Sequence, residues 1–324
     1  MSEKILVFGG AGYIGSHVVK CLLGNGCEPI VADNLSFGHR QAVLTDEFEQ
    51  ADLLDVKSID RIFDKHKIDA VIHLAAFMQV EESFANPAKY YRNNVVGTLN
   101  LLDSMVRHGV KKIVFSSTAA IFGNPQYIPI DEAHPKNPIN PYGQSKLMIE
   151  RIFEDYHRAY GLSHIALRYF NASGADKDGQ IGESHDPETH LIPLVLKAIN
   201  GERKNVKIFG SDYDTPDGTC LRDYIHVEDL AEAHRLALEA TNRFSGGLNL
   251  GTGIPTSVKE IIGAAEKITD KKCPVEYAPR RAGDPPKLYA SNEKAKEILS
   301  WIPKYTDIER IIQTAWNWEK NKKF

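Results

Sequence analysis

Tyr142 and Lys146 stand four residues apart in the segment NPYGQSK (residues 140–146), which reads as the start of a helix. At this spacing both side chains lie on one face of a helix, one turn apart. A free phenol has a pKa of about 10 and is a poor base at neutral pH, but a neighbouring ammonium group favours its ionised form. The pair therefore predicts a general acid/base, with an exposed helix pair worth a few tenths of a kcal/mol as the alternative.

A hydroxyl side chain precedes this pair at the end of a predicted strand. Thr118 follows the apolar segment KKIVFSS (residues 111–117) and comes 24 residues before Tyr142. Doubly wound sheets bind their ligands at the carboxyl ends of their strands. We therefore expect Thr118 to lie in the same site as Tyr142 and Lys146.

The first turn of the chain carries a glycine pattern typical of dinucleotide binding. Gly9, Gly12 and Gly15 follow a strand-like segment and open a helical one. Such glycines permit a tight turn, close approach of the backbone to a pyrophosphate and close packing of helix on strand, and the helix N-terminus offers free N–H groups. Asp33, 18 residues after Gly15, is placed to bind the ribose hydroxyls and to repel a 2′-phosphate. The pattern predicts NAD rather than NADP, with a generic glycine-rich turn as the alternative.

Two further segments are candidates for the cofactor site. Asp52 and Leu53 follow another predicted strand and are candidate adenine contacts, although an aspartate that caps its own loop fits the sequence equally well. The segment HLAA (residues 73–76) ends a strand with small residues, among them Ala75, which suit a position beneath a cofactor. His73 in that segment is interpreted as a core histidine.

These residues lie in an alternation of strands and helices. Strands are predicted at 4–9, 28–33, 69–75, 111–117 and 163–169, and helices at 13–24, 56–66, 88–108 and 142–160. This order predicts an α/β fold with a doubly wound parallel (Rossmann-type) sheet. We expect a cofactor domain over residues 1–170 and a smaller α/β substrate domain over 171–324, with residues 222–245 able to pack back on the first domain.

Composition argues against several classes of protein. The 324 residues carry a net charge of −4, which offers no basic field for nucleic acid. No apolar run reaches the roughly 18 residues of a membrane span, and the first residues do not have the layout of a signal peptide. Four cysteines without paired spacing argue against disulfides and metal sites. We expect a cytoplasmic protein that does not act on nucleic acid or membranes.

Eight segments occur in the order of a known family's motifs. They are GGAGYIGSH (9–17), DNLS (33–36), HLAA, YYRNNVVGT (90–98), SSTAAIFG (116–123), NPYGQSK, RYFN (168–171) and TCLRDYIHVEDLA (219–231). The chain resembles the extended short-chain dehydrogenase/reductases, and within them the UDP-hexose 4-epimerases, over essentially its whole length. The resemblance implies tightly bound NAD, transient oxidation of a UDP-hexose at C4 to a 4-keto sugar, and return of the hydride to the opposite face. It also implies a homodimer formed through segments 92–108 and 146–160.

Roles for individual residues follow from the same resemblance. Tyr142 is expected to be the catalytic acid/base, Lys146 to lower its pKa and hold the nicotinamide ribose, and Thr118 to bind the sugar 4-hydroxyl. The expected cofactor contacts are Gly9, Gly12, Tyr13, Ile14, Gly15, Asp33, Asn34, Ser36, Asp52, Leu53, Ala75, Asn93, Tyr142, Lys146 and Tyr169. The expected substrate contacts are Thr118, Asn171, His190, Leu191, Arg222, Arg281 and Asp284, of which the two arginines suit a diphosphate.

The chain departs from the family pattern at three positions. Met78 stands where some relatives have a lysine near the cofactor, and His190 stands where an asparagine is frequent. Leu288 matches a position that is tyrosine in enzymes confined to glucose and galactose, and a small residue in those that also accept N-acetylhexosamines. Leucine is intermediate in size, so both substrate ranges stay open.

Other functions are considered beside the epimerase. A dehydratase or decarboxylase of the same family is the nearest alternative, but relatives that dehydrate carry Asp-Glu directly after the strand-end hydroxyl, where this chain has Ala119 and Ala120. An NAD-dependent dehydrogenase would release NADH. A non-catalytic dinucleotide-binding module is disfavoured because both Tyr142 and Lys146 are present.

Overall fold

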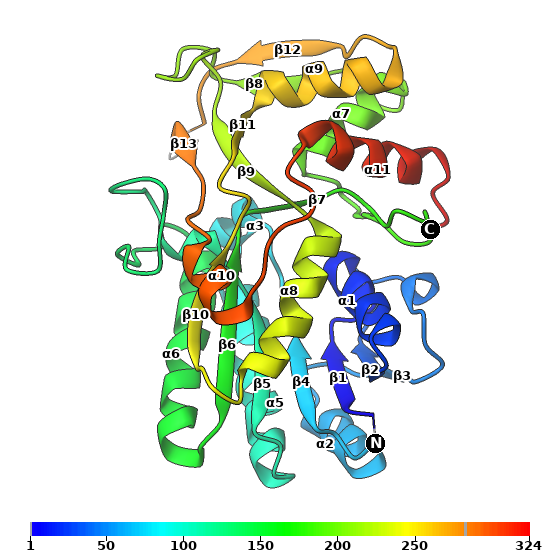
Figure 1. The fold of residues 1–324 in the computed structure, drawn as a ribbon, viewed down its shortest axis with the longest axis vertical. Helices are drawn as coiled ribbons and strands as arrows, with labels where there is room; N and C mark the ends of the chain where they lie inside the picture. The colour runs from blue at the N-terminus through cyan, green and yellow to red at the C-terminus, as the bar shows by residue number, and fades with distance from the viewer. Residues whose placement is uncertain (1, 282–283) are drawn as a thin grey trace.

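A computed structural model describes residues 2–281 and 284–324 (Figure 1). Its largest element is a seven-stranded sheet in the order β10-β6-β5-β4-β1-β2-β3. All neighbouring strands of this sheet pair in parallel, which confirms the predicted doubly wound fold. The strands are β1 (Lys4–Phe8), β2 (Glu28–Asp33), β3 (Phe48–Gln50), β4 (Ala70–His73), β5 (Lys112–Thr118), β6 (Ser163–Tyr169) and β10 (Gly246–Leu250).

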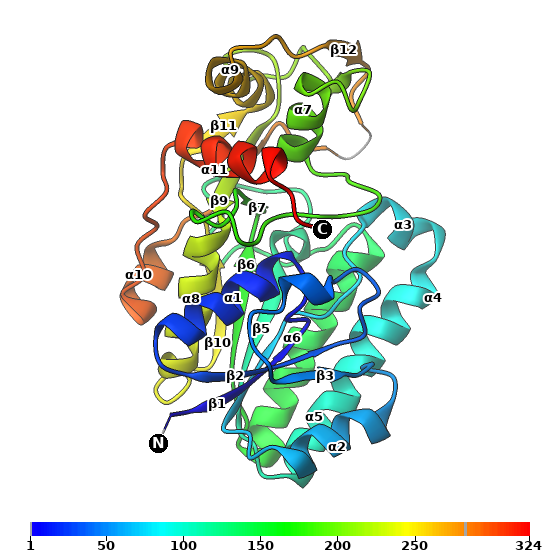
Figure 2. The same cartoon turned by 90° about the vertical axis from the view of Figure 1, so that its right-hand side faces the viewer.

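Helices cover both faces of this sheet (Figure 2). Side chains alternate along β1, so Ile5 and Val7 pack on one side with α1 (Tyr13–Gly24) and α8 (Val227–Ala240). Leu6 and Phe8 face the other side, which α2 (Val56–Lys65), α5 (Gly97–Arg107) and α6 (Pro141–Tyr160) cover. Burial on both faces explains why the strands read as continuous apolar runs.

The helix predicted over residues 88–108 is divided. It comprises α4 (Pro87–Tyr90), the π-helical segment η2 (Tyr91–Val96) and α5, and it follows α3 (Val80–Ala85). A π-helical turn holds an extra residue and is frequent at functional sites. Asn93 of η2 lines the cleft described below, while the neighbouring Asn94 is buried. Apolar periodicity gave no sign of this interruption.

A smaller unit lies beyond the carboxyl ends of the large sheet (Figure 1). Its strand β9 (Leu221–His226) pairs with β7 (Asn171–Ser173), β11 (Pro255–Ser257) and β13 (Lys287–Leu288). A second pair joins β8 (Val206–Phe209) to β12 (Val275–Ala278). Helices α7 (Leu191–Ile199), α9 (Val258–Thr269) and α11 (Ile308–Lys320) form its apolar core.

The chain crosses between the two units more than once. After β9, α8 packs on α1, and β10 then adds to the large sheet beside β6. The short helix α10 (Glu293–Leu299) contacts both α8 and β10. The division at residue 170 therefore stays a prediction about the two units. Residues 282–283, between the predicted substrate contacts Arg281 and Asp284, lie outside the described residues. No helix in the described ranges is both long and apolar enough to cross a membrane.

Candidate active site

A cleft of about 450 Å³ opens where the carboxyl ends of β1, β2, β4, β5 and β6 meet the smaller unit. It lies where doubly wound sheets bind ligands. Of the predicted site residues, the cleft is lined by Gly9, Gly12, Tyr13, Ile14, Gly15, Asp33, Asn34, Ser36, Leu53, Ala75, Asn93, Thr118, Tyr142, Lys146, Tyr169, Asn171, His190 and Arg222. Asp52, Leu191, Arg281 and Asp284 are not among its lining residues.

The glycine-rich turn is packed so tightly that a side chain at Gly9 or Gly15 would clash with the backbone. A Cβ on Gly9, whose φ is 89°, would lie 2.6 Å from the backbone nitrogen of Ala75. A Cβ on Gly15 would lie 2.1 Å from the carbonyl oxygen of Gly9, whereas at Gly12 the nearest atom is 3.5 Å away. Gly12 is also the N-cap of α1 and has no side chain to cap the first turn. The first N–H groups of α1 thus face an open cradle, which fits a dinucleotide pyrophosphate.

Replacing Gly15 with alanine is expected to abolish cofactor binding. The added methyl group must displace the Gly9 carbonyl, and such overpacking costs about 1–3 kcal/mol while it distorts the turn. The measurement is the NAD released on denaturation, with the thermal midpoint beside it. The control is Gly24→Ala at the other end of α1, where the added Cβ would meet nothing within 4 Å. A Gly15→Ala protein with normal NAD content would contradict the assignment of this turn.

Asp33 ends β2 with its carboxylate held toward the cleft. Its two oxygens accept hydrogen bonds from the backbone N–H groups of Ala11 (3.1 Å) and Leu35 (2.8 Å). Burial raises the pKa of Asp33, and these two donors partly offset that effect. Each oxygen keeps a lone pair for another donor, so the carboxylate can accept bonds from the two ribose hydroxyls of NAD.

Asp52 does not line the cleft but contacts Asn34, which does. Its carboxylate accepts hydrogen bonds from the side chain of Asn34 and from the backbone of Leu54, both at 2.8 Å. It therefore positions Asn34 and caps its own loop, the alternative already present in the sequence analysis. Leu53 points inward instead, is 3% exposed and lines the cleft.

Tyr142 sits in the first turn of α6, whose start is fixed locally. Asn140 caps the helix by accepting a hydrogen bond from the Gly143 N–H (2.7 Å), and Pro141 occupies the first helical position. A Cβ on Gly143 would lie 2.5 Å from the Ala120 carbonyl oxygen, so the missing side chain allows α6 to pack on the segment after β5. That close approach brings Tyr142 beside Thr118 at the end of β5.

Two opposing effects act on the Tyr142 phenol, and together they leave its pKa raised above the ordinary value. Burial raises its pKa, because the charged form is poorly solvated, and a hydrogen bond from Thr118 lowers it. Lys146 remains a predicted partner of the phenol and of the nicotinamide ribose, and in the structure it makes other contacts. Its ammonium group donates to the Ser116 carbonyl oxygen (2.7 Å) and lies 4.5 Å from the centre of the Phe115 ring.

Two opposing effects act on the pKa of Lys146. Burial lowers the pKa of Lys146 to about 7, and the Glu150 carboxylate one turn further along α6 opposes that shift. Glu150 in turn is paired with Arg168 of β6 (2.7 Å), and both side chains are more than nine-tenths buried. Ser117 also donates to Glu150 at 2.6 Å. Sequence reasoning missed this network, although an acidic residue four positions after Lys146 was a usable signal.

Arg222 lines the substrate end of the cleft and is held by groups of the protein. Arg222 donates to the carbonyl oxygens of Leu221 (2.8 Å) and Pro285 (2.9 Å), and to Asp284 (2.6 Å). Among the described residues, three of its five N–H donors are thereby used, and two remain for a diphosphate. Asp284 does not line the cleft and instead holds Arg222 in place.

Two predicted substrate contacts lie elsewhere. Arg281 is exposed, with its guanidinium 3.9 Å from the centre of the Phe209 ring. Leu191 begins α7 and packs on the apolar core of the smaller unit. Asn171 does line the cleft and is fixed by a bond from its amide to the Asp223 carbonyl oxygen (2.9 Å). The sequence motifs predicted which segments lie near a ligand, but not the direction in which each side chain points.

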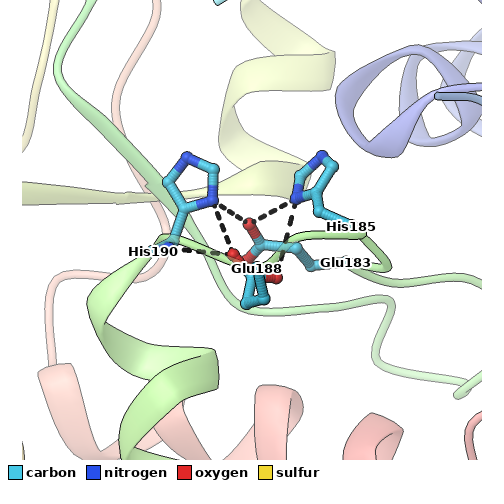
Figure 3. Close-up of side chains that lie close together, drawn as sticks. All are labelled: Glu183, His185, Glu188 and His190. Atoms are coloured by element: carbon cyan, nitrogen blue, oxygen red, sulfur yellow. Dashed lines mark hydrogen bonds and ion pairs between the residues drawn. The ribbon is translucent and has the colours of Figure 1, made fainter. Parts of the chain in front are cut away.

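His190 belongs to a compact cluster that the sequence analysis overlooked (Figure 3). Its Nδ1 lies 2.8 Å from Glu183 and 3.0 Å from Glu188, and His185 approaches the same two carboxylates. Burial favours neutral imidazole, but the two carboxylates outweigh it and raise the pKa of His190 to about 10. Glu183, His185 and His190 line the cleft. The regular spacing of Glu and His over residues 183–190 was the available signal.

Comparison with known proteins gives one consistent result. The sequence matches the model of the NAD dependent epimerase/dehydratase family over residues 5–251. The UDP-glucose 4-epimerase of Halalkalibacterium halodurans is 54% identical over 318 residues, which cover 98% of this chain and 95% of that protein. The crystal structure of the Brucella ovis UDP-glucose 4-epimerase in complex with NAD has a TM-score of 0.95 at 50% identity and covers 97% of this chain and 98% of its own. The UDP-Glc/GlcNAc 4-epimerase of Campylobacter jejuni has a TM-score of 0.88 at 44% identity and covers 99% and 100%.

Proposed function

The chain belongs to the NAD dependent epimerase/dehydratase family, and from that membership we propose that it interconverts UDP-galactose and UDP-glucose as a 4-epimerase. One observation carries the proposal. The Tyr142 phenol and the Thr118 hydroxyl line the same cleft as the dinucleotide cradle and as Arg222. A sugar anchored through a diphosphate at Arg222 can then reach the phenol with the cofactor beside it.

In the proposed reaction, Tyr142, Thr118 and Lys146 have separate roles. When bound, NAD supplies a hydride acceptor at C4 of a positively charged nicotinamide ring, and its reduced form supplies the donor. Tyr142, as phenolate, removes the proton from the sugar 4-hydroxyl and later returns it. Thr118 donates to the phenolate and stabilises it, and Lys146 places a positive charge at the same end of the cleft.

Turning of the sugar explains how the configuration at C4 inverts. The nucleotide and diphosphate are held by remote contacts, among which the Arg222 guanidinium lines the cleft. Binding energy from these remote groups keeps the 4-keto sugar bound without fixing which face it presents. The 4-keto sugar can therefore rotate and accept the hydride on the opposite face.

Conversion of UDP-galactose by the purified protein, followed by proton NMR without added NAD, tests the proposal. Appearance of UDP-glucose would support a 4-epimerase with tightly bound NAD. No conversion, even after NAD is supplied, would reject it.

The residues after Thr118 favour this reaction over dehydration. Both Ala119 and Ala120 line the cleft, and neither side chain can transfer a proton. Elimination of water requires an acid/base pair at the sugar's C5 and C6. A 4,6-dehydratase would release one water per sugar, and a product of the same mass as the substrate separates the two reactions.

We also propose that Leu288 sets the range of sugars. It lines the cleft on β13, whereas its neighbour Lys287 lines a separate hollow. The Leu288→Gly variant is expected to raise kcat/KM for UDP-N-acetylgalactosamine relative to UDP-galactose by about tenfold or more, because pocket contacts of a few methylenes discriminate to this extent. Lys287→Ala is the control and should leave the ratio unchanged. An unaltered ratio in Leu288→Gly would remove Leu288 from this role.

The assembly and the division into units are proposals as well. The resemblance implies a homodimer through segments 92–108 and 146–160, but Ile149 and Phe153 of α6 are buried within the chain's own core. The exposed large hydrophobic residues of these segments are Val96, Met148 and Tyr160, at 45%, 37% and 51%. Light scattering of the wild type and of a Met148→Glu variant tests whether these exposed residues form the dimer contact.

We also infer that residues 171–324 supply the substrate-binding unit, apart from α8 and β10.

A further inference from the structure

The Glu183, His185, Glu188 and His190 side chains form a cluster that the proposed reaction does not use as a whole. Their ligand-type atoms all lie within 4.8 Å of one another. The segment that holds them leads from β7 to α7, and Figure 3 shows the two imidazole rings facing the same pair of carboxylates. Two nitrogens and two carboxylates therefore converge on one point from eight consecutive residues.

Distances within the cluster suit a metal ion. The Nδ1 atom of His190 lies 2.8 Å from Glu183 and 3.0 Å from Glu188, and that of His185 lies 3.2 Å and 3.6 Å from them. A tetrahedral ion with bonds of about 2.0–2.1 Å keeps its ligand atoms roughly 3.3 Å apart. Small movements of the side chains would bring all four atoms to that spacing.

His185 provides a second and independent observation. Its Nδ1 atom is buried and, within the described part of the chain, makes no hydrogen bond of acceptable geometry. The ring nevertheless directs this nitrogen at the two carboxylates, and the side chain is 12% exposed. The distances from this nitrogen to Glu183 and Glu188, 3.2 Å and 3.6 Å, are long for hydrogen bonds, so an ion between these groups would satisfy the buried nitrogen better than a proton does.

The charge of the cluster also permits a cation. Two carboxylates and two protonated imidazoles sum to zero, and so do two carboxylates, two neutral imidazoles and one divalent ion. A divalent ion can therefore replace two protons without leaving an uncompensated buried charge. Mixed nitrogen and oxygen ligands favour zinc and similar transition metals, since magnesium and calcium prefer oxygen alone.

We propose that Glu183, His185, Glu188 and His190 bind one divalent transition-metal ion, with zinc the best fit. The ion would fix the segment between β7 and α7 against the cofactor turn, because the Tyr13 hydroxyl donates to the Gly174 carbonyl oxygen (2.6 Å) and the Tyr13 ring lies edge-on to His185 at 6.2 Å. The site joins the glycine-rich turn to the smaller unit and does not depend on the reaction proposed above.

Calorimetric titration of the full-length, chelator-treated protein with Zn²⁺ tests the site. The wild type is expected to bind one ion per chain, and Glu188→Gln to bind it at least about tenfold more weakly. Glu188 does not line the cleft, so this variant leaves the reacting groups in place. The matched control is Glu49→Gln, which removes a similarly buried carboxylate 2.9 Å from His66 in another part of the fold and should leave Zn²⁺ affinity unchanged.

Co²⁺ absorption gives a second measurement with a second variant. Four-coordinate Co²⁺ bound by the wild type should show strong visible bands, and His185→Gln should lose them. Circular dichroism and thermal unfolding establish that each variant folds. Absence of saturable Zn²⁺ binding in the wild type would overturn the proposal, and so would equal affinity in the wild type, Glu188→Gln and His185→Gln.

Discussion

Phenylalanine at position 142 is expected to lower turnover of UDP-galactose by about 10²- to 10⁴-fold, the usual contribution of a general acid/base. The ring stays in place while the group that carries the proton is lost. Because the hydroxyl is held by Thr118 and not by the apolar core, the fold and the bound cofactor should be retained. Steady-state kinetics and NAD content measure the two effects separately.

A matched control is available on the same helix. Tyr160 lies at the other end of α6 and is 51% exposed, so Tyr160→Phe should leave turnover unchanged. Near-normal activity in Tyr142→Phe would show that another group moves the proton. Loss of activity together with loss of NAD would instead assign Tyr142 to cofactor binding.

Breaking the buried pair between Arg168 and Glu150 is expected to have the largest effect on stability. Arg168 donates from Nε (3.0 Å) and Nη2 (2.7 Å) to the two carboxylate oxygens, with 6% and 8% of the two side chains exposed. Removal of one partner from such a pair costs about 3–5 kcal/mol, because the other charge remains buried without compensation. The unfolding midpoint of Arg168→Met in urea should fall accordingly.

A double variant distinguishes the effect of losing the ion pair from the effect of losing side-chain packing. The double variant Glu150→Gln/Arg168→Met removes both charges of the pair, so it should be more stable than Arg168→Met alone. Arg158→Met removes the exposed pair with Asp155 on the same helix, where both side chains are more than two-thirds exposed, and should change the midpoint little. If Arg168→Met also changes little, the buried pair does not stabilise the fold.

Glu150 links this stability to the chemistry. Its carboxylate raises the pKa of Lys146 against the effect of burial. In the proposed reaction, the charged form of Lys146 is therefore favoured by a residue that does not line the cleft. This connection crosses from α6 to β6, and the linear order of motifs contains no sign of it.

Local patterns determined the parts of the site that the sequence predicted well. The turn at Gly9, Gly12 and Gly15 is confined to one strand-helix junction, and Asp33 ends the adjacent strand. Tyr142 follows from the capped start of one helix. Each of these features depends on residues close in the chain, so composition and spacing were sufficient.

Contacts between distant segments were predicted less well. Lys146 binds the Ser116 carbonyl oxygen, and Asp284 holds Arg222 from outside the cleft. Arg281 instead lies over Phe209. A motif indicates which segment approaches a ligand, but the direction of each side chain depends on packing that is set elsewhere. For the same reason the periodicity of α6 did not show that Ile149 faces the core.

Transfer of a label at C4 tests the central claim most directly. UDP-galactose carrying deuterium at C4 would be incubated with the purified protein, without added NAD, and the products analysed by proton NMR and mass spectrometry. A reaction in which the same hydride leaves and returns predicts UDP-glucose that retains deuterium at C4, of unchanged mass, with no NADH released. UDP-glucose with a solvent proton at C4, or the release of NADH, would contradict it.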